Sequence, residues 1–164
     1  MLPIERLNAV LLAAMRVGKT TPFVQRYRML DPVITQVFDL QTVLAESVGF
    51  AWFRRYTVST YTANFDNYDG QTFRTSPSVR TLPDGQVIVA TQFVPRDDSP
   101  TALNYVMKLN PAGWQVVDVP AEGSISRVAT QRSDFAGLLA SGGAPALIAG
   151  LQRKIASLSG GMLA

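Results

Sequence analysis

The chain has 164 residues, of which 47% are hydrophobic and only 16% are charged. It contains no cysteine and no histidine, which excludes disulfides, thiolate metal sites and cysteine nucleophiles and removes the commonest general base. Its net charge of +3 is mild and its arginines are scattered, whereas nucleic-acid binding usually needs a basic stripe or tail, so no nucleic-acid partner is predicted.

The first segment has the pattern of an amphipathic helix. Pro3 suits the first helical turn, and apolar residues recur at helical spacing as far as Met15, before Gly18 ends the run. Residues 7–15 resemble the apolar part of a signal peptide, but no Lys/Arg-rich segment precedes them and no small-residue cleavage site follows. We predict a helix here and expect any export signal to have been removed.

A second helix is predicted after a short loop. Thr20 or Thr21 can cap it, because a hydroxyl accepts hydrogen bonds from the free backbone amides of a first turn, and Pro22 fits that turn. Asp31-Pro32 repeats the start signal, so a new helical segment is predicted to begin there.

Two more helical segments are predicted before the sheet. Asp39 can cap a short helix that Gly49 closes. Residues 50–65 carry an aromatic stripe at roughly helical spacing. We predict a helix over them, although β-branched residues such as Thr57 and Val58 lower the helical propensity.

After Gly70 the apolar period changes to two, which predicts strands. A first strand is expected near residues 72–79, and a second places Val87 and Phe93 on one face. Asp84-Gly85, between the two strands, suits a type I′ hairpin turn.

A second hairpin is predicted further along the chain. The third strand places alternate residues from Leu103 to Leu109 on one face, and a turn at residues 110–113 leads into a fourth strand over residues 114–119. Because the strands are sequential and linked by hairpins, we expect an antiparallel meander.

The tail of the chain returns to helical spacing. Ser126 or Ser133 can cap a segment that Gly142-Gly143 stops, and Pro145 opens a last helix whose end is expected to fray. The predicted fold class is therefore α+β, with N-terminal helices, a four-stranded antiparallel curved sheet and C-terminal helices in a single domain of residues 1–164.

Few residues are available for catalysis. Most acidic residues lie near turns, and Asp118 in the fourth strand is interpreted as a structural hydrogen-bond acceptor. The segment DNYDGQTF lacks the later bidentate glutamate of a calcium loop, and Ser124 and Ser126 have no histidine partner for a triad. We predict no catalytic residue, no metal site and no cofactor.

The excess of aromatic and aliphatic residues has two interpretations. These residues can form an ordinary packed core, or they can line an apolar cavity between the sheet and the helices. Burial of an acyl chain contributes about 0.8 kcal/mol per CH₂ group, so two long chains supply ample affinity without polar chemistry.

Several motifs together resemble a known family. The stretch GWQVVDVPAEGSISRVATQRSDFAGLLASGGAPALIAGL (residues 113–151) resembles the signature of MlaC-like proteins, also called toluene-tolerance or ABC-transporter auxiliary proteins. Further matches are FDL at residues 38–40, VGFAW at residues 48–52 and YTANFDNYDGQTF at residues 61–73. YVMKL, followed by GWQVVDV, looks most like the hopanoid-associated, HpnM-like branch.

The resemblance implies a periplasmic lipid carrier that holds its lipid between the sheet and the helices. Such a carrier would shuttle phospholipid or hopanoid between a membrane-bound transporter and an outer-membrane lipoprotein, the partners of an ABC-type lipid transport system. The family has no catalytic residues to carry over.

The resemblance and the strand pattern together suggest which residues contact the lipid. The expected cavity-lining residues are Phe38, Trp52, Tyr56, Tyr61, Phe65, Val87, Val89, Tyr105, Met107, Trp114 and Phe135. Arg28, Arg54 and Arg55 are the candidates for attracting a phosphate headgroup, because guanidinium groups form charge-assisted hydrogen bonds with phosphate.

One feature departs from the family pattern. Trp52 runs directly into Phe53, where the family usually has a further polar helical stretch. Either the helical hairpin is shortened here or residues are missing from the sequence, and in the second case a continuous helix across this junction is not expected.

Two other classes of function fit parts of the sequence. A small-molecule enzyme of the ketosteroid-isomerase kind could use Asp118 as a base and Tyr105 as a hydrogen-bond donor. An interaction module of a membrane transport complex would instead have a filled core and hold no ligand.

Overall fold

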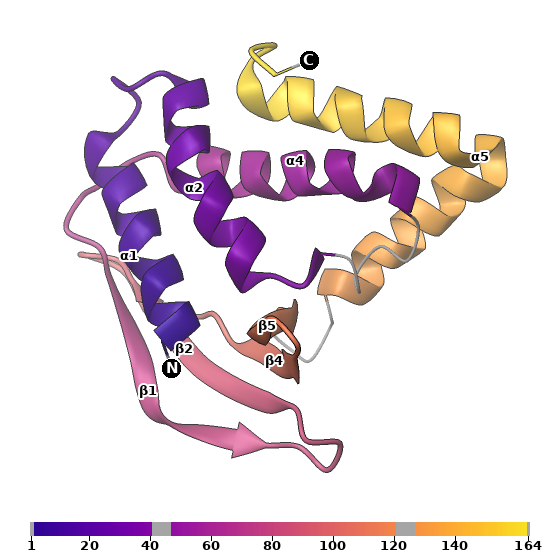
Figure 1. Ribbon diagram of the computed structural model, residues 1–164. Coiled ribbons are helices and arrows are strands. Elements are labelled where there is room, and N and C mark those ends of the chain that lie inside the picture. The colour runs from indigo at the N-terminus through magenta and orange to yellow at the C-terminus, as the bar shows by residue number, and fades with distance from the viewer. Residues whose placement is uncertain (1, 41–46, 121–126, 164) are drawn as a thin grey trace.

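The computed structural model describes residues 2–40, 47–120 and 127–163, with the side chains of residues 47–50, 127–136 and 139 excepted. Within these ranges the chain forms four helices and a five-stranded sheet (Figure 1). In chain order the elements are α1 (Leu2–Val17), α2 (Phe23–Val37), α4 (Ser47–Asn64), β1 (Thr72–Thr81), β2 (Val87–Val94), β3 (Thr101–Ala102), β4 (Tyr105–Asn110), β5 (Gly113–Asp118) and α5 (Arg127–Ser159).

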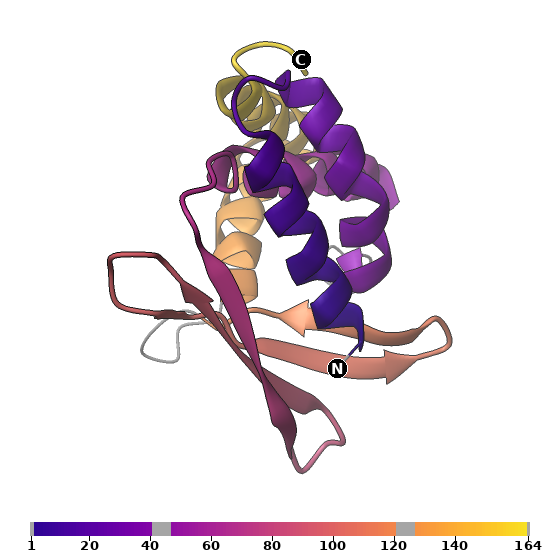
Figure 2. The same ribbon diagram turned by 90° about the vertical axis from the view of Figure 1, so that its left-hand side faces the viewer.

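The sheet is antiparallel throughout, with strand order β1-β2-β4-β5. The short strand β3 pairs with the end of β2 and precedes β4 along the same side of that strand. The helices gather on one face of the sheet, and the β1–β2 hairpin extends beyond them (Figure 2). The predicted α+β class and its antiparallel sheet are confirmed, and β3 is a fifth strand that the sequence pattern did not predict.

The core lies where α1, α2 and α4 face the sheet. Helix α1 contributes a stripe at helical spacing that includes Ile4, Leu7 and Leu11, all fully shielded from solvent. The stripe belongs to one hydrophobic cluster with residues of α2, α4, β2, β4, β5 and the second half of α5. The apolar face of each element is therefore turned toward a common centre.

The predicted start of a new helix at Asp31-Pro32 is wrong, because α2 continues through Pro32 as one helix. Its buried residues Leu30, Ile34 and Val37 keep helical spacing across the proline, which is itself exposed. A proline inside a helix costs about 3 kcal/mol. Burial of each large aliphatic side chain contributes about 1.5–3 kcal/mol, so packing both halves of α2 on one core outweighs this cost.

The predicted cap of α2 is also absent. The hydroxyls of Thr20 and Thr21 donate to the backbone carbonyl of Val17, at 3.1 and 3.3 Å, and so satisfy the end of α1. Helix α2 begins at Phe23 with no side-chain hydrogen bond to its first turn.

Helix α4 runs without interruption across the Trp52-Phe53 junction, and Gly49 lies within it rather than closing a helix. Its threonines are tolerated because their hydroxyls bond inside the helix. Thr57, Thr60 and Thr62 each donate to the backbone carbonyl four residues earlier, at 2.7–2.9 Å. The short helix predicted between Asp39 and Gly49 falls mostly on residues 41–46, which lie outside the described residues.

The β1–β2 hairpin is predicted at the right place with the wrong turn type. The Leu82 amide donates to the Gln86 carbonyl at 2.7 Å and the Gly85 amide to the Leu82 carbonyl at 3.0 Å, so the loop has three residues. Pro83 fixes the first turn residue at negative φ, and Gly85 has a φ of 83°. This is the arrangement of a type I turn followed by a left-handed glycine, not a type I′ turn.

The burial of β4 does not follow the prediction to the end of the strand. Leu109 is 58% exposed, although it was expected on the buried face with Met107. The pairing of β4 with β5 shifts register between Val106 and Met107, and both of these neighbours are buried. The extra residue at this shift, Val117, lies on β5, so β4 keeps its two-residue period. Leu109 therefore shares the face of Met107, but it lies one residue from the end of β4 and is not covered there.

The break predicted in the C-terminal helix is confirmed. Gly143 has non-helical angles, φ 69° and ψ −159°, so α5 consists of two helical segments that meet at a kink (Figure 1). The predicted fraying of the end is wrong for the residues that directly follow α5. The Gly161 amide donates to the Ala156 carbonyl at 2.8 Å and Gly160 has positive φ, which together form a Schellman cap.

Candidate functional site

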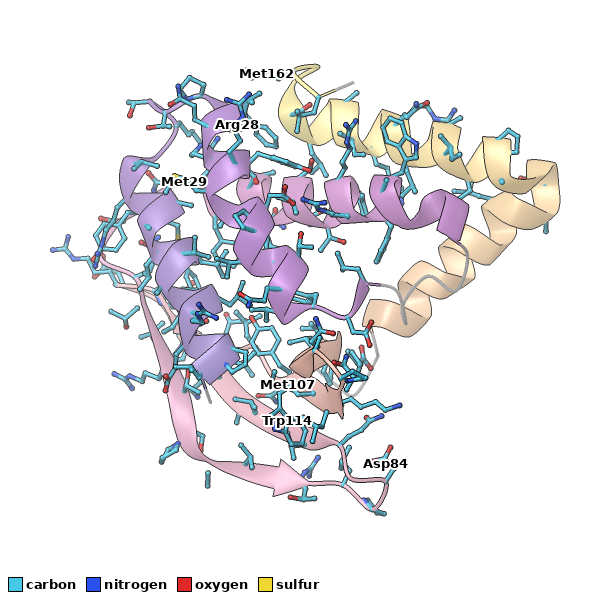
Figure 3. All side chains as sticks on the ribbon, viewed as in Figure 1. Arg28, Met29, Asp84, Met107, Trp114 and Met162 are labelled. Atoms are coloured by element: carbon cyan, nitrogen blue, oxygen red, sulfur yellow. The ribbon has the colours of Figure 1, made fainter. Side chains whose placement is uncertain are left out.

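Four of the predicted cavity-lining residues come together at the centre of the sheet. The register places Val87 opposite Met107 and Val89 opposite Tyr105 across β2 and β4. All four side chains are buried and belong to the hydrophobic cluster under the helices. Met107 and Trp114 lie on the sheet below the helices in Figure 3.

A chain of aromatic rings extends from this centre toward the edge of the sheet. We call Phe38, Tyr61, Phe65, Phe73 and Phe93 the aromatic row. Successive ring centroids are 5.6 Å apart from Phe38 to Tyr61, 5.8 Å from Tyr61 to Phe65 and 5.9 Å from Phe65 to Phe93. Phe73 and Phe93, which are cross-strand partners, close the row at 5.3 Å. Each such pair contributes about 0.5–1.5 kcal/mol beyond burial.

The position of Phe38 depends on the sheet as well as on α2. Phe38 forms an isolated parallel bridge with Val116 of β5, and the Asp39 amide donates to the Val116 carbonyl at 2.9 Å. The end of α2 is thus fixed against the sheet, and Phe38 is held beside Tyr61 of α4.

Two members of the aromatic row were not among the predicted site residues. Phe93 shares the inward face of β2 with Val87 and Val89, so the alternation of β2 contained the necessary signal. Phe73 is identified only through its pairing with Phe93, which the sequence does not specify by itself.

The remaining predicted apolar residues lie at the margin of the core. Trp52, Tyr56 and Trp114 are half-buried and pack against the hydrophobic cluster. A cation covers two of these rings: the Arg55 guanidinium lies 5.1 Å from the Trp52 centroid and the Lys154 amine 5.5 Å from the Tyr56 centroid. The Phe135 side chain lies outside the described residues.

The three arginines proposed for a headgroup do not form one cluster. Arg54 makes a bidentate ion pair with Asp31, with Nε to Oδ1 at 2.9 Å and Nη2 to Oδ2 at 2.6 Å. Arg54 and Arg55 line a cavity of about 330 Å³ between α2 and α4, together with Tyr27, Asp31 and Ala51. Arg28 is exposed and does not line this cavity.

Another arginine has a structural role that its sequence position did not reveal. Arg26 of α2 is only 5% exposed, and its Nη1 donates to the backbone carbonyl of Thr62 at 2.8 Å. Its Nε donates to the Thr21 carbonyl at 3.2 Å. Arg26 thus places a positive charge at the C-terminal turn of α4, where helix carbonyls are unsatisfied, and ties that turn to the loop before α2.

The phenol of Tyr27 has a perturbed pKa that leads to a testable pH dependence. Burial, followed by the Asp31 carboxylate, raises the pKa of Tyr27 above its ordinary 10.0, while Arg54 and Arg55 lower it. Above that ordinary value the unfolded chain loses the proton before the folded chain does, so the free energy of unfolding falls as pH rises through the raised pKa. Below pH 10.0, the ordinary pKa, Tyr27 is protonated in both states, and its contribution to the free energy of unfolding is fully present.

We therefore expect Tyr27→Phe to flatten this alkaline loss of stability, because phenylalanine has no proton to release. Urea unfolding of the wild type and the variant between about pH 9 and pH 11 measures the two slopes. Parallel slopes would show that Tyr27 does not titrate differently in the two states.

The described residues contain neither a metal cluster nor a membrane span. In residues 2–40, 47–120 and 127–163, no three acidic side chains gather closely enough to hold a metal ion. None of the described helices is both long and apolar enough to cross a bilayer.

Comparison with known proteins identifies the family. The family model described as MlaC protein matches residues 50–153. The structure of a phospholipid-binding protein from Ralstonia solanacearum, solved in complex with a phospholipid, has the same fold, with a TM-score of 0.73 and 21% sequence identity over 96% of this chain and 94% of that chain. The curated proteins include no significant match to the sequence. Because the matched segment spans more than half of the chain, this protein belongs to the MlaC family.

Proposed function

We propose that the protein binds a lipid and carries it through the periplasm between the inner and outer membranes. The observation that carries this proposal is membership of the MlaC family, together with a fold shared with a phospholipid-binding protein. Phospholipid is the first candidate ligand and a hopanoid the second, the latter from the resemblance of residues 105–119 to the hopanoid-associated branch.

The acyl chains would lie along the aromatic row and the inward face of the sheet. These surfaces are apolar and lie between the sheet and the helices. Each CH₂ group buried there contributes about 0.8 kcal/mol, so chain burial alone is sufficient for binding. Met107 and Tyr105 are buried among their neighbours, and a lipid that reached them would have to displace part of this packing.

The proposed partners are a membrane-bound transporter and an outer-membrane lipoprotein of an ABC-type lipid transport system. They follow from the resemblance to the MlaC family, whose members are also called ABC-transporter auxiliary proteins. The carrier itself would need no cofactor, because transfer of a bound lipid breaks no covalent bond.

The ketosteroid-isomerase alternative finds no support in the sheet geometry. Asp118 is the cross-strand partner of Val106, so the two side chains leave the same face of the sheet. Tyr105 precedes Val106 in β4 and therefore points to the opposite face, where it is buried beside Val89. A base and a hydrogen-bond donor on opposite faces do not form one site.

Native mass spectrometry of gently purified protein is the decisive experiment for lipid binding. We expect a bound species at near-stoichiometric level that is lost on denaturation, and its mass in an organic extract distinguishes phospholipid from hopanoid. A protein that stays unliganded after incubation with vesicles of either lipid class would overturn the proposal.

A pair of variants tests the route of the acyl chains. Phe65→Ala removes the central ring of the aromatic row, and we expect roughly tenfold weaker lipid loading, the effect of about 1.4 kcal/mol. Leu109→Ala removes an exposed side chain on the sheet and should leave loading unchanged. Equal loading of both variants would exclude the aromatic row as the lipid route.

A further inference from the structure

The cavity between α2 and α4 is lined mainly by polar residues, whereas the space between the sheet and the helices is lined by apolar ones. Tyr27 and Asp31 lie one turn apart on α2, and Ala51, Arg54 and Arg55 lie within about one turn on α4. The two helices therefore present their polar side chains to a common space of about 330 Å³. Four of its five lining residues carry a polar group, so the space suits a small polar group better than an acyl chain.

The cavity carries one net positive charge. Arg54 and Arg55 contribute two positive charges and Asp31 one negative charge, which gives +1. The Asp31 carboxylate accepts two bonds from Arg54 and a third from the Thr35 hydroxyl at 3.2 Å. Asp31 is thus largely saturated, and its function is to hold the Arg54 guanidinium in a fixed plane.

The orientation of Arg54 leaves donors for a ligand. The ion pair uses Nε and Nη2, so the Nη1 group lies outside it. The Arg55 Cζ lies over the Trp52 ring, 5.1 Å from its centroid, and this cation–π contact restrains the guanidinium without an ion pair. Two oriented guanidinium groups on neighbouring positions match the several oxygens of a phosphate.

The cavity also borders the hydrophobic cluster. Tyr27 lines the cavity and Trp52 contacts its Arg55, and both rings are half-buried against that cluster, so the polar space has an apolar side. The phenol of Tyr27, whose pKa burial raises further from its ordinary 10.0, is a neutral O–H donor at neutral pH. A polar group with an attached apolar chain fits a boundary of this kind.

We propose that this cavity binds a phosphate group, with Arg55 and the Nη1 group of Arg54 as charged donors and the Tyr27 hydroxyl as a neutral donor. A phosphodiester carries one negative charge, which neutralises the net charge of the cavity. The source is either the headgroup of a phospholipid or free inorganic phosphate. The first source rests on the proposed lipid-carrier function, and the second does not.

The test compares Arg55→Gln with Arg16→Gln. Both changes remove an exposed arginine stacked on an aromatic ring, Trp52 in one case and Tyr68 at 5.2 Å in the other, but Arg16 does not line the cavity. The probes are a short-chain phosphatidylglycerol, the diacylglycerol with the same chains but no phosphate, and inorganic phosphate. Titration calorimetry measures affinity, and phosphorus NMR reports on the phosphate itself.

We expect the wild type to bind the phospholipid more tightly than the diacylglycerol, and Arg55→Gln to reduce this preference roughly tenfold, the effect of one lost charge-assisted hydrogen bond. Arg16→Gln should leave the preference unchanged. Tyr27→Phe should weaken phospholipid binding by a smaller factor without altering diacylglycerol binding, because it removes a neutral donor only.

The outcomes separate this proposal from the carrier function. If inorganic phosphate binds in an Arg55-dependent manner while neither lipid binds, the cavity is a phosphate site and the carrier function fails. If both lipids bind equally well to the wild type and to Arg55→Gln, and inorganic phosphate causes no shift, lipid binding stands and the phosphate site is overturned.

Discussion

Replacing Met107 with alanine is expected to lower the free energy of unfolding of the lipid-free protein by about 2–5 kcal/mol. Met107 is 0% exposed and lies between its cross-strand partners Val87 and Val116, at the centre of the inward face of the sheet. Truncation at such a site loses the transfer free energy of the deleted atoms and leaves a cavity that rigid neighbours fill only in part.

The matched control is Leu109→Ala, two residues further along β4. Leu109 is exposed, so its truncation should change the free energy of unfolding by no more than about 0.5 kcal/mol. Urea unfolding with an unchanged m-value measures both effects. A cost below about 1 kcal/mol for Met107→Ala would show that Met107 lines a pre-formed cavity rather than a packed core.

This experiment also bears on how a lipid would enter. If the full cost is found, the sheet centre is packed in the lipid-free protein, and binding must rearrange these side chains. Addition of lipid should then stabilise the wild type by mass action, because the ligand binds the folded state alone. The Met107 variant would gain more from lipid than the wild type does, since an acyl chain can occupy the space that truncation leaves.

Gly143→Ala is expected to destabilise the protein by about 1–3 kcal/mol. The angles of Gly143, φ 69° and ψ −159°, fall in a region that is essentially restricted to glycine. An added Cβ meets nothing closer than Pro145 Cδ at 3.8 Å, so the cost arises from backbone strain and not from a collision. Thermal or urea unfolding measures it.

Gly137→Ala is the control within the same helix. Gly137 has ordinary helical angles and an added Cβ would meet none of the described atoms within 4 Å, so alanine should stabilise the helix by about 0.5–1 kcal/mol. Opposite signs for the two substitutions would establish that α5 needs its kink. Equal, small effects would show that the two segments can join as a straight helix.

The kink matters because it lets the two segments of α5 pack on each other and on the core. Beyond it, Leu147, Leu151 and Ile155 are buried at helical spacing. A Cβ on Gly150 would lie 2.9 Å from Leu138 Cδ1, so the Leu138 side chain would have to shift to admit it. The backbone angles of Gly143 thus serve a tertiary contact between the two segments.

The sequence by itself determined where helices and strands occur. Periodicity predicted α1, the aromatic helix α4, the strands of both hairpins and the segments of α5, because burial of one face imposes a helical or a two-residue spacing. Glycine marked two chain reversals correctly, after α1 and at Gly143, since few other residues adopt the required φ. The order and spacing of the motifs were sufficient to indicate the MlaC family, which the match over residues 50–153 confirms.

Only the tertiary structure decided which of the local helix-breaking and helix-capping patterns take effect. Pro32 is a helix-breaking signal, but burial of Leu30 and Ile34 on one core holds α2 together. Asp31 is a capping residue by sequence, yet it binds Arg54 of another helix. The aromatic row and the cavity between α2 and α4 each join side chains from different elements. Their formation depends on free energies summed over contacts between distant segments. A local pattern reports which residues prefer burial or a turn, but not which partners they meet.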